Sequence, residues 1–420
     1  MRKTLFRSAA VLAAVTMLTA CSSGGDTPAA TTAPAAPETS AAPAGATGSL
    51  TIWVDENRKP AVQAAVDIYN ETNPDVDVEL VVKNFEDIRA DFLAQVPTGE
   101  GPDITIGAHD WLGSFIVNGV AEPVDLGEKA SQFESVATQA FTYDGALYGL
   151  PYALESIAVV RNTALVDSTP ATWDELIAKG KEAKTKYPFV INTNGTTGDA
   201  YTYYGLQTSF GAPVFQQNAD GSYTNEIGMG GDAGLAFAKF LGENGMKGEG
   251  HFSTDWTYDV ANQEFADGNA PYTIAGPWAI ATFTGAGVDV AVDPIPSAGG
   301  KPAAPFVGVQ GFYLSSQSDS KLIANDFLVN YVATPDVIKA LYDADPRLPA
   351  MTSVAEQVAS DPIVAGFLAS AKQGAPMPSI PEMGDVWEFW NAAESSIISG
   401  SAEPEAAWTK MLADLEAKLG

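Results

Sequence analysis

The stretch Thr273–Ile280, TIAGPWAI, places the largest aromatic side chain directly after a break in an apolar run. Gly276 and Pro277 make that break, because glycine and proline interrupt regular structure more than other residues do. Trp278 is therefore expected just past the end of a strand. An indole in that position has two interpretations. It covers part of a hydrophobic core, or it offers a flat apolar face to a ligand.

Polar and aromatic side chains also follow two other predicted strands. The runs Leu50–Val54 and Pro102–Gly107 have the β-branched and apolar composition of strands. The segments Asp55–Arg58 and Ala108–Trp111 come directly after them. In open α/β sheets, ligands bind beyond the carboxyl ends of the strands. Both segments are therefore candidates for a binding site.

Four acids are candidates for chemistry, and each has a competing structural interpretation. Glu155 stands in the apolar run LPYALESIAVV, where a buried carboxylate without a partner would be costly, which favours a functional role. Asp110 could instead cap the helix predicted to follow it. Asp55 and Asp199 could be ordinary acids of loops.

Composition excludes several classes of function. The chain of 420 residues has 22 Lys plus Arg against 52 Asp plus Glu, a net charge of −30, which argues against nucleic acid as a partner. The one cysteine is Cys21, and the two histidines are His109 and His251. Such a chain is poorly suited to a Cys- or His-based metal site or to a hydrolase triad. The Gly-rich stretch Asn192–Asp199 lacks the lysine and the spacing of a phosphate loop. No metal, cofactor or catalytic residue is predicted.

Residues 1–20 have the pattern of a signal peptide. Basic residues precede a short apolar run, Ala9–Ala20, which is shorter than the ~20 residues that span a bilayer. The run ends in LTAC, which resembles a bacterial lipobox and implies lipid attachment at Cys21. Residues 21–48 are mainly Ala, Pro, Thr, Ser and Gly and are predicted to form a disordered tether. We therefore expect a lipid-anchored protein at the outer face of a cytoplasmic membrane, of the Gram-positive type.

The rest of the chain alternates predicted strands and helices. Between the tether and Gly107 the order is strand, helix, strand, helix, strand, which is typical of an α/β fold with a mostly parallel sheet. A second α/β region begins near Ile157, and the pattern becomes mainly helical after Pro305–Ser316. Two α/β lobes, with the chain crossing between them, would enclose a cleft.

Six segments in one order carry a resemblance to a known family. They are GPDITIGAHDW (101–111), YGLPYALESIAVVRNTAL (148–165), TWDEL (172–176), YTIAGPWAI (272–280), PFVGVQGFYLSS (305–316) and MPSIPEMGDVW (377–387). From about Leu50 to the C-terminus the chain resembles the extracellular solute-binding proteins of ABC sugar importers, most closely the maltose/maltodextrin-binding branch. The resemblance implies a two-lobed, periplasmic-binding-protein-like α/β fold that closes on a sugar and has no enzymatic activity.

The same resemblance implies a division of the chain and a set of hinges. Lobe 1 would comprise residues 49–154 and about 310–357, and lobe 2 residues 155–309 and about 358–420. The chain crossings near Leu154–Ile157 and Val307–Gly311 would act as hinges, and the ligand cleft would lie between the lobes.

Carried over position by position, the resemblance implies two kinds of substrate-binding residue. Those that hydrogen-bond sugar hydroxyls are Asp55, Asn57, Arg58, Asp110, Glu155 and Asp199. Those that offer aromatic surface are Tyr201, Trp256, Trp278 and Trp387, and Trp111 is a further aromatic candidate that the family pattern does not supply. Two positions depart from the family: Trp111 stands where maltose binders often have Arg, and Arg89 stands where an acid is expected. Trp256 could also pack beneath the site, and His109 is expected to hydrogen-bond structurally.

The expected partners are an oligosaccharide of the maltose/maltodextrin type and the membrane permease subunits of an ABC importer, with the protein itself a monomer. Three alternatives remain open on the sequence. The fold could bind another sugar, such as trehalose. The chain could be an extracellular glycoside hydrolase, with two carboxyl groups ~5–9.5 Å apart. It could also be a surface lipoprotein that only adheres.

Overall fold

The computed structural model describes residues 47–218 and 222–419. The predicted signal peptide, Cys21 and nearly all of the predicted tether lie outside these residues. Within the part of the chain that is described, no helix is both long enough and apolar enough to cross a membrane.

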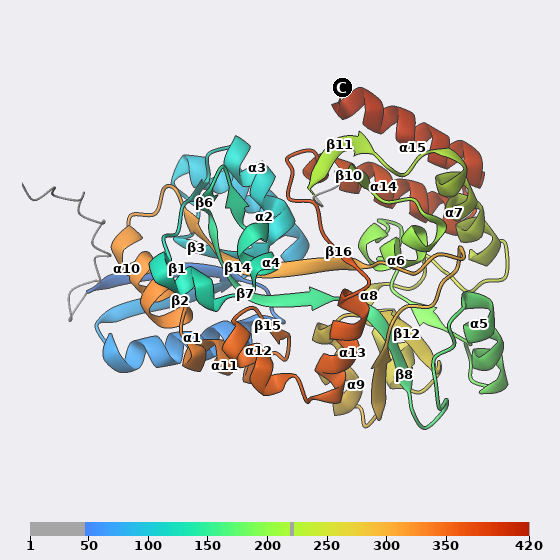
Figure 1. Cartoon of the computed structure of the whole chain (residues 1–420), viewed down its shortest axis with the longest axis horizontal. Helices are drawn as coiled ribbons and strands as arrows, with labels where there is room; N and C mark the ends of the chain where they lie inside the picture. Colours follow the sequence, from blue (N-terminus) through green and yellow to red (C-terminus); the bar gives the residue numbers. More distant parts are fainter. Residues whose placement is uncertain (1–46, 219–221, 420) are drawn as a thin grey trace, which may run out of the picture. The chain divides into compact units, whose positions relative to one another are not determined.

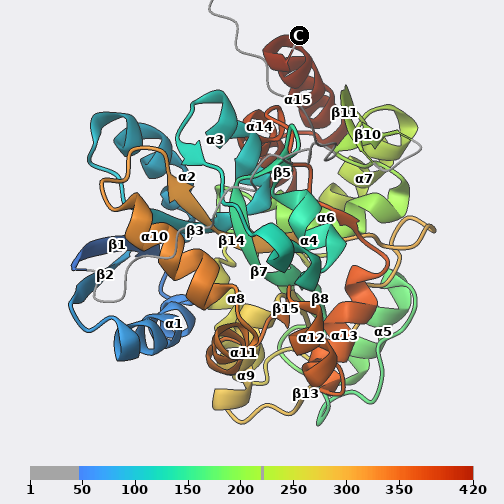
Figure 2. The same ribbon diagram turned by 60° about the vertical axis from the view of Figure 1, so that its left-hand side comes forward.

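The larger of two main sheets begins the fold. Its main path, in spatial order, is β15 (Leu348–Pro349), β7 (Gly149–Ser156), β14 (Phe306–Ser315), β3 (Ile104–Ala108), β1 (Gly48–Val54) and β2 (Val76–Val82). Two short strands, β4 (Ala121–Glu122) and β16 (Ala375–Pro376), also pair with β14. Figures 1 and 2 show β1 and β2 side by side at one edge.

The expectation of a mostly parallel sheet is wrong for half of this sheet. Strands β2, β1 and β3 are parallel, because helices connect them. Along the main path, strands β14, β7 and β15 pair antiparallel with their neighbours, while the short β16 pairs parallel with β14. No simple strand–helix–strand unit joins these three strands to the first three, so the spacing of apolar residues could not reveal their direction.

A smaller sheet is built from the middle of the chain. Its spatial order is β13 (Val290–Asp293), β8 (Ala158–Asn162), β12 (Tyr272–Ala275) and β9 (Val190–Ile191). Two separate hairpins are β5 (Thr142–Tyr143) with β6 (Ala146–Leu147) and β10 (Phe215–Gln217) with β11 (Tyr223–Ile227). The two main sheets confirm the predicted α/β class.

Helices occupy the connections between strands. Before β8 they are α1 (Lys59–Thr72), α2 (Phe85–Gln95), α3 (Leu112–Val117) and α4 (Ser135–Ala140). From β8 to β14 they are α5 (Trp173–Glu182), α6 (Ala200–Phe210), α7 (Gly231–Asn244), α8 (Tyr258–Ala266) and α9 (Ile280–Gly285). After β14 they are α10 (Lys321–Asp326), α11 (Pro335–Ala344), α12 (Thr352–Val358), α13 (Pro362–Ala371), α14 (Met383–Ile398) and α15 (Pro404–Leu419). A π-helical turn, Phe327–Val332, continues α10.

Local sequence explains where the first helices begin and which face they bury. In α1, Pro60 stands in the first turn, where the missing N–H is tolerated, and Val62, Val66 and Tyr69 are buried at helical spacing. Helix α2 begins after Asn84, whose side chain accepts a hydrogen bond from the Glu86 N–H. The cap fixes the orientation of the first turn of α2, which reaches the candidate site.

Strands β7 and β14 link the two sheets. They pair antiparallel from Gly149 with Tyr313 to Ser156 with Val307, and every residue of both strands is buried. Strand β7 continues through Ile157 into β8 of the smaller sheet, and β14 follows β13 of that sheet. Figure 1 shows the pair running through the middle of the view. The predicted crossings fall on this strand pair.

Helices α14 and α15 pack against each other and against α7 (Figure 1). Trp408 of α15 is fully buried, and its indole N–H donates to the Met229 carbonyl at 2.9 Å. Its ring meets Phe237 edge-on at 5.5 Å. The last helix of the chain is therefore part of the core.

We predict that Trp408→Ala lowers the free energy of unfolding by about 3–5 kcal/mol, because it removes a buried ring and leaves a carbonyl without a donor. Denaturant unfolding followed by circular dichroism measures the change. Val117→Ala is the control, because Val117 is 69% exposed, and it should shift stability by less than about 0.5 kcal/mol. An equal loss in both variants would contradict the assignment of Trp408 to the core.

Candidate functional site

A cavity of about 780 Å³ lies beyond the carboxyl ends of β1, β2 and β3. It is also lined by residues that follow β9 and β12 of the smaller sheet and by α14. Of the predicted binding residues, those that line it are Asp55, Asn57, Arg58, Asp110, Trp111, Glu155, Asp199, Tyr201, Trp278 and Trp387. The structure thus brings together predicted residues from six separate places along the chain.

Trp256 is the predicted residue that the structure places outside this lining. It is 6% exposed and meets Tyr187 edge-on at 5.3 Å. Its backbone carbonyl accepts from the Thr193 N–H at 3.0 Å. The competing interpretation, packing beneath the site, describes this geometry.

Asp55 organises the turn between β1 and α1. Its carboxylate accepts from the Asn57 and Arg58 N–H groups and, at 2.9 Å, from the Arg58 guanidinium. Burial raises the pKa of Asp55, but the charge and hydrogen bonds of Arg58, together with the charge of Arg347, outweigh burial, so the pKa lies below its ordinary value. Asp55 therefore remains ionised and holds Arg58 at the cavity.

Glu155 is the centre of a buried charge chain at the base of the cavity. One carboxylate oxygen forms an ion pair with Arg347, and the other lies 3.7 Å from Arg58 and accepts from the Gln310 amide at 2.6 Å. Arg347 also donates to Asp345 at 2.6 Å. The premise that Glu155 lacks a partner was wrong, because its partner lies 192 residues further along the chain.

Asp110 has a different environment from the other acids. It is 4% exposed, and its Oδ1 has no hydrogen-bond partner among the described residues. Burial raises its pKa to about 6, although Arg89 and the Trp387 indole N–H partly oppose the shift. Helix α3 begins at Leu112 without a side-chain cap, so the capping alternative for Asp110 is wrong. Asp110 Oδ1 is therefore an unpaired acceptor on a side chain that lines the cavity.

His109 supports the site from below. Its Nδ1 accepts from the Val309 N–H at 3.0 Å, so Nε2 carries the proton and donates to the Met377 carbonyl at 2.8 Å. Burial lowers its pKa to about 4. This confirms the predicted structural role: neutral His109 joins the end of β3 to β14 and to the segment that leads into α14.

Asp199 combines two roles. It is the N-cap of α6, where one oxygen accepts from the Thr202 N–H at 3.1 Å and the other from the Thr202 hydroxyl and the Asn192 amide. The predicted alternative, that Asp199 is an acid of a loop, is realised here as a helix cap. Asp199 lines the cavity while its hydrogen bonds hold the first turn of α6, which carries Tyr201.

Trp278 is only partly buried and lies in the short turn that follows β12. A Cβ on Gly276 would lie 2.2 Å from its six-membered ring, so the indole packs directly over the glycine backbone. Its neighbours are Tyr201, with ring centroids 6.4 Å apart, and the Arg347 guanidinium, 5.5 Å from the ring. The Gly-Pro break thus holds an indole at the cavity wall.

Trp387 and Trp111 enter the wall with different degrees of exposure. Trp387 is partly buried and stacks on the fully buried Trp390 at 5.6 Å and 12°. Trp111 is 6% exposed, and its ring lies 5.0 Å from that of Phe85. Trp387 therefore presents more surface to a ligand than Trp111 does.

Sequence reasoning missed several lining residues, among them Phe85, Tyr258, Asn262, Gln310 and Arg347. Phe85 could have been found, because it follows β2 just as Asp55 follows β1. Arg347 gave no such signal, since it lies in an irregular segment after α11 and reaches the site only through long-range packing. Among the described residues, no group of three His, Cys, Asp or Glu could hold a metal ion.

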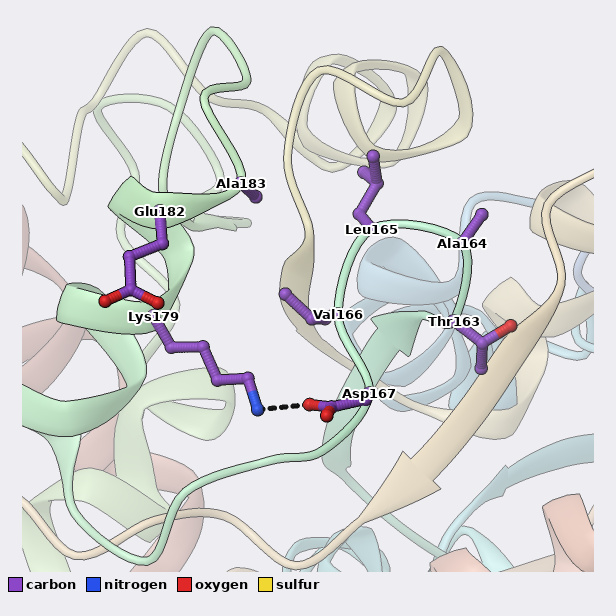
Figure 3. Close-up of a pocket in the computed structure, with 8 residues that line it drawn as sticks. All are labelled: Thr163, Ala164, Leu165, Val166, Asp167, Lys179, Glu182 and Ala183. Carbon is purple, nitrogen blue, oxygen red and sulfur yellow. Dashed lines mark hydrogen bonds and ion pairs between the residues drawn. The ribbon is translucent and has the colours of Figure 1, made fainter.

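A second hollow, of about 350 Å³, lies between α5 and the loop after β8 (Figure 3). An ion pair joins Lys179 to Asp167 there, and the Asp167 side chain is 87% exposed. Exposed ion pairs hold little energy, and none of the predicted binding residues lies here. We do not consider it a candidate site.

Comparison with known proteins identifies the class to which this fold and site belong. Residues 64–366 match the family model described as bacterial extracellular solute-binding protein, and the chain belongs to that family.

Individual relatives narrow the likeness. A maltotriose-binding protein of Pyrococcus abyssi is 29% identical over 354 residues, which cover 81% of this chain and 75% of the relative. A galactooligosaccharide-binding protein of Bacillus subtilis is 26% identical, with 88% and 89% covered. The structure of the Thermus thermophilus maltotriose-binding protein bound with maltotriose matches with a TM-score of 0.81 and 30% identity, over 88% of this chain and 100% of that one. The predicted two-lobed, periplasmic-binding-protein-like fold is confirmed.

The raised pKa of Asp110 predicts a pH-dependent stability. Between its unfolded value of 3.8 and its folded value of about 6, the folded protein retains a proton that the unfolded chain releases. Stability from this group is therefore lost as the pH rises through that window. Asp110→Asn should become more stable relative to the native protein between pH 4 and pH 7, by up to about 3 kcal/mol.

Urea unfolding of both proteins across this pH range measures the difference. His109, with its lowered pKa, contributes in the opposite direction, but it is present in both proteins and cancels in the difference. A stability difference that does not change with pH would contradict the assigned environment of Asp110.

Proposed function

We propose that this protein is the substrate-binding lipoprotein of an ABC importer, which captures an oligosaccharide of the maltose/maltodextrin type and delivers it to a membrane permease. The proposal is supported by the family, by a relative and a solved structure named for maltotriose binding, and by the chemistry of the cavity. The observation that carries it is the mixture of unpaired polar atoms on side chains that line the cavity.

Five buried polar atoms without a hydrogen-bond partner among the described residues belong to cavity-lining side chains. They are Arg58 Nε, Asp110 Oδ1, Tyr201 Oη, Gln310 Oε1 and Arg347 Nη2. Two can only donate, two can only accept, and the phenol can do either. A phosphate or carboxylate ligand would require donors alone. A sugar hydroxyl both donates and accepts, so the mixture suits a neutral carbohydrate.

The aromatic side chains complete this chemistry. A sugar ring has faces made largely of C–H groups, and Trp278, Tyr201 and Trp387 offer flat apolar surface at the same cavity. The fully buried Phe306 packs behind two of them, since its ring lies 6.1 Å from Tyr201 and 6.0 Å from Trp387. Three rings at one cavity suit an oligosaccharide better than a single sugar unit.

Transport requires the site to open and close. We propose that the lobes move about the strand pair β7–β14 and that sugar shifts the population toward the closed form, because only that form contacts the ligand from both sheets. The lobes would be residues 49–154 with about 310–357 and residues 155–309 with about 358–420. The closed form would dock on the permease, while the lipid at Cys21 would keep the monomeric protein at the membrane.

The aromatic anchor can be tested directly. We predict that Trp278→Ala weakens maltotriose binding by at least about 2 kcal/mol, because it removes the partly exposed indole from the wall. Isothermal titration calorimetry with maltose, maltotriose, trehalose and monosaccharides gives the ligand preference and the loss. Trp408→Phe, a change in the core far from the cavity wall, should leave the affinity unaltered. Equal affinities for the native protein and Trp278→Ala would argue against an anchor role.

A glycoside hydrolase is the alternative with related chemistry. It would need one protonated and one ionised carboxyl on opposite sides of the scissile bond. Here Asp55 and Glu155 are both engaged with guanidinium groups, and Asp199 is occupied as a helix cap. Asp110 alone among these four combines a free oxygen with a raised pKa, because both oxygens of Asp199, whose pKa burial also raises, are occupied by Thr202 and Asn192. Among these four predicted acids, one free acid without a second does not make the pair.

We therefore predict that prolonged incubation with maltodextrin gives no shortened products, as judged by chromatography of the sugars. A commercial amylase in the same buffer is the positive control. Release of shorter oligosaccharides that disappears in Asp110→Asn would favour the hydrolase.

A further inference from the structure

The charge chain at the base of the cavity places one guanidinium against an aromatic ring on each side of Glu155. Arg347 Cζ lies 5.5 Å from the Trp278 ring, which follows β12 of the smaller sheet. Arg58 Cζ lies 4.3 Å from the Phe85 ring, which follows β2 of the larger sheet. Phe85 and Trp278 therefore occupy matching places on the two walls, and both line the cavity.

We propose that Phe85 is a ligand-binding aromatic residue of the first lobe, the counterpart of Trp278, and that Trp111 is its positioning residue. This inference rests on the proposed function, because it assigns a residue within the same sugar site. Phe85 would contact the face of the sugar opposite the face that Trp278 contacts. The sequence did not suggest Phe85 for this role.

Exposure separates Phe85 from the other phenylalanine of its helix. Phe85 opens α2 and is partly buried. Phe92, two turns later, is fully buried between Trp53 at 6.4 Å and Phe115 at 4.8 Å. The helix thus uses Phe92 for the core, while the Asn84 cap holds Phe85 at the edge of the cavity.

Trp111 acts on the ligand through Phe85. Its ring packs on Phe85 at a centroid distance of 5.0 Å and an interplanar angle of 35°. A Cβ at Gly107 would lie 2.3 Å from the Trp111 ring, so the glycine leaves room for the indole to lie flat behind Phe85. The result is a stack of Arg58, Phe85 and Trp111, one residue from each of three successive strand ends. Trp111 therefore supplies packing at the position where an Arg was expected.

Two aromatic walls favour one sugar configuration. In an α-glucosyl unit every ring oxygen substituent except the anomeric one is equatorial, so both faces present mainly C–H groups to Phe85 and Trp278. A galactosyl unit carries an axial oxygen at C4, which disturbs stacking on one face and, at the non-reducing end, is a hydroxyl that a ring wall would leave without a hydrogen-bond partner. The pair should therefore select glucosyl over galactosyl oligosaccharides.

Calorimetry with maltotriose and β-1,4-galactotriose tests the inference. Phe85→Leu should bind maltotriose about tenfold more weakly, because stacking on one face is lost. Its preference for maltotriose over galactotriose should shrink. Phe85→Tyr keeps the ring and should bind within about threefold of the native protein. Trp111→Leu should weaken binding in the native background but have little further effect when Phe85 is already Leu.

Phe92→Leu is the matched control, with the same change on the same helix. It should lower the melting temperature and leave maltotriose affinity within about twofold of native, since Phe92 does not line the cavity. Native affinity in Phe85→Leu, alongside weakened binding in Trp278→Ala, would overturn the inference and leave the proposed function standing. Failure of the native protein to bind any tested oligosaccharide would overturn both.

Discussion

The cavity depends on one carboxylate that two guanidinium groups share. Glu155 stands on the strand that joins the two sheets, with Arg58 from the first strand turn on one side and Arg347 from the segment after α11 on the other. All three side chains are at most 6% exposed. Removing one partner of such a buried pair leaves an uncompensated charge, at a typical cost of 3–5 kcal/mol. Their mutual positions are therefore strongly determined.

Several features of the walls follow from that base. Each guanidinium faces one aromatic ring, so the ion chain orients groups from both sheets at the point where the chain crosses between them. His109 performs a related task without charge, since it ties β14 and the segment leading into α14 to the turn that carries Asp110. Strong polar contacts thus lie beneath the site, while the atoms left unpaired lie on the side chains that line it. A binding protein needs both conditions, because a ligand competes poorly with groups that are already satisfied.

The sequence predicted the parts of this arrangement that local rules control. The strand ends at Asp55 and Asp110, the Gly-Pro turn before Trp278 and the helical spacing of α1 depend on neighbours within a few residues. Other features depend on contacts between distant segments, which the sequence alone does not show. They are the direction of β7 and β14, the partner of Glu155 and the packing of Trp111 behind Phe85. The family resemblance predicted that residues from two lobes meet at one cleft. It also predicted Trp256 as a binding residue, which the structure places outside the cavity lining.

The glycines behind Trp278 and Trp111 have a consequence for how such a protein could be redesigned. Gly276 and Gly107 each lie so close to an indole that any side chain there would displace it. With the ion chain below, these positions form a base that tolerates little variation. Tyr258 and Asn262 on α8 and Asn194 in the loop before α6 also line the cavity, outside that base. New carbohydrate preferences should therefore be sought by randomising these three positions, with that base left unchanged.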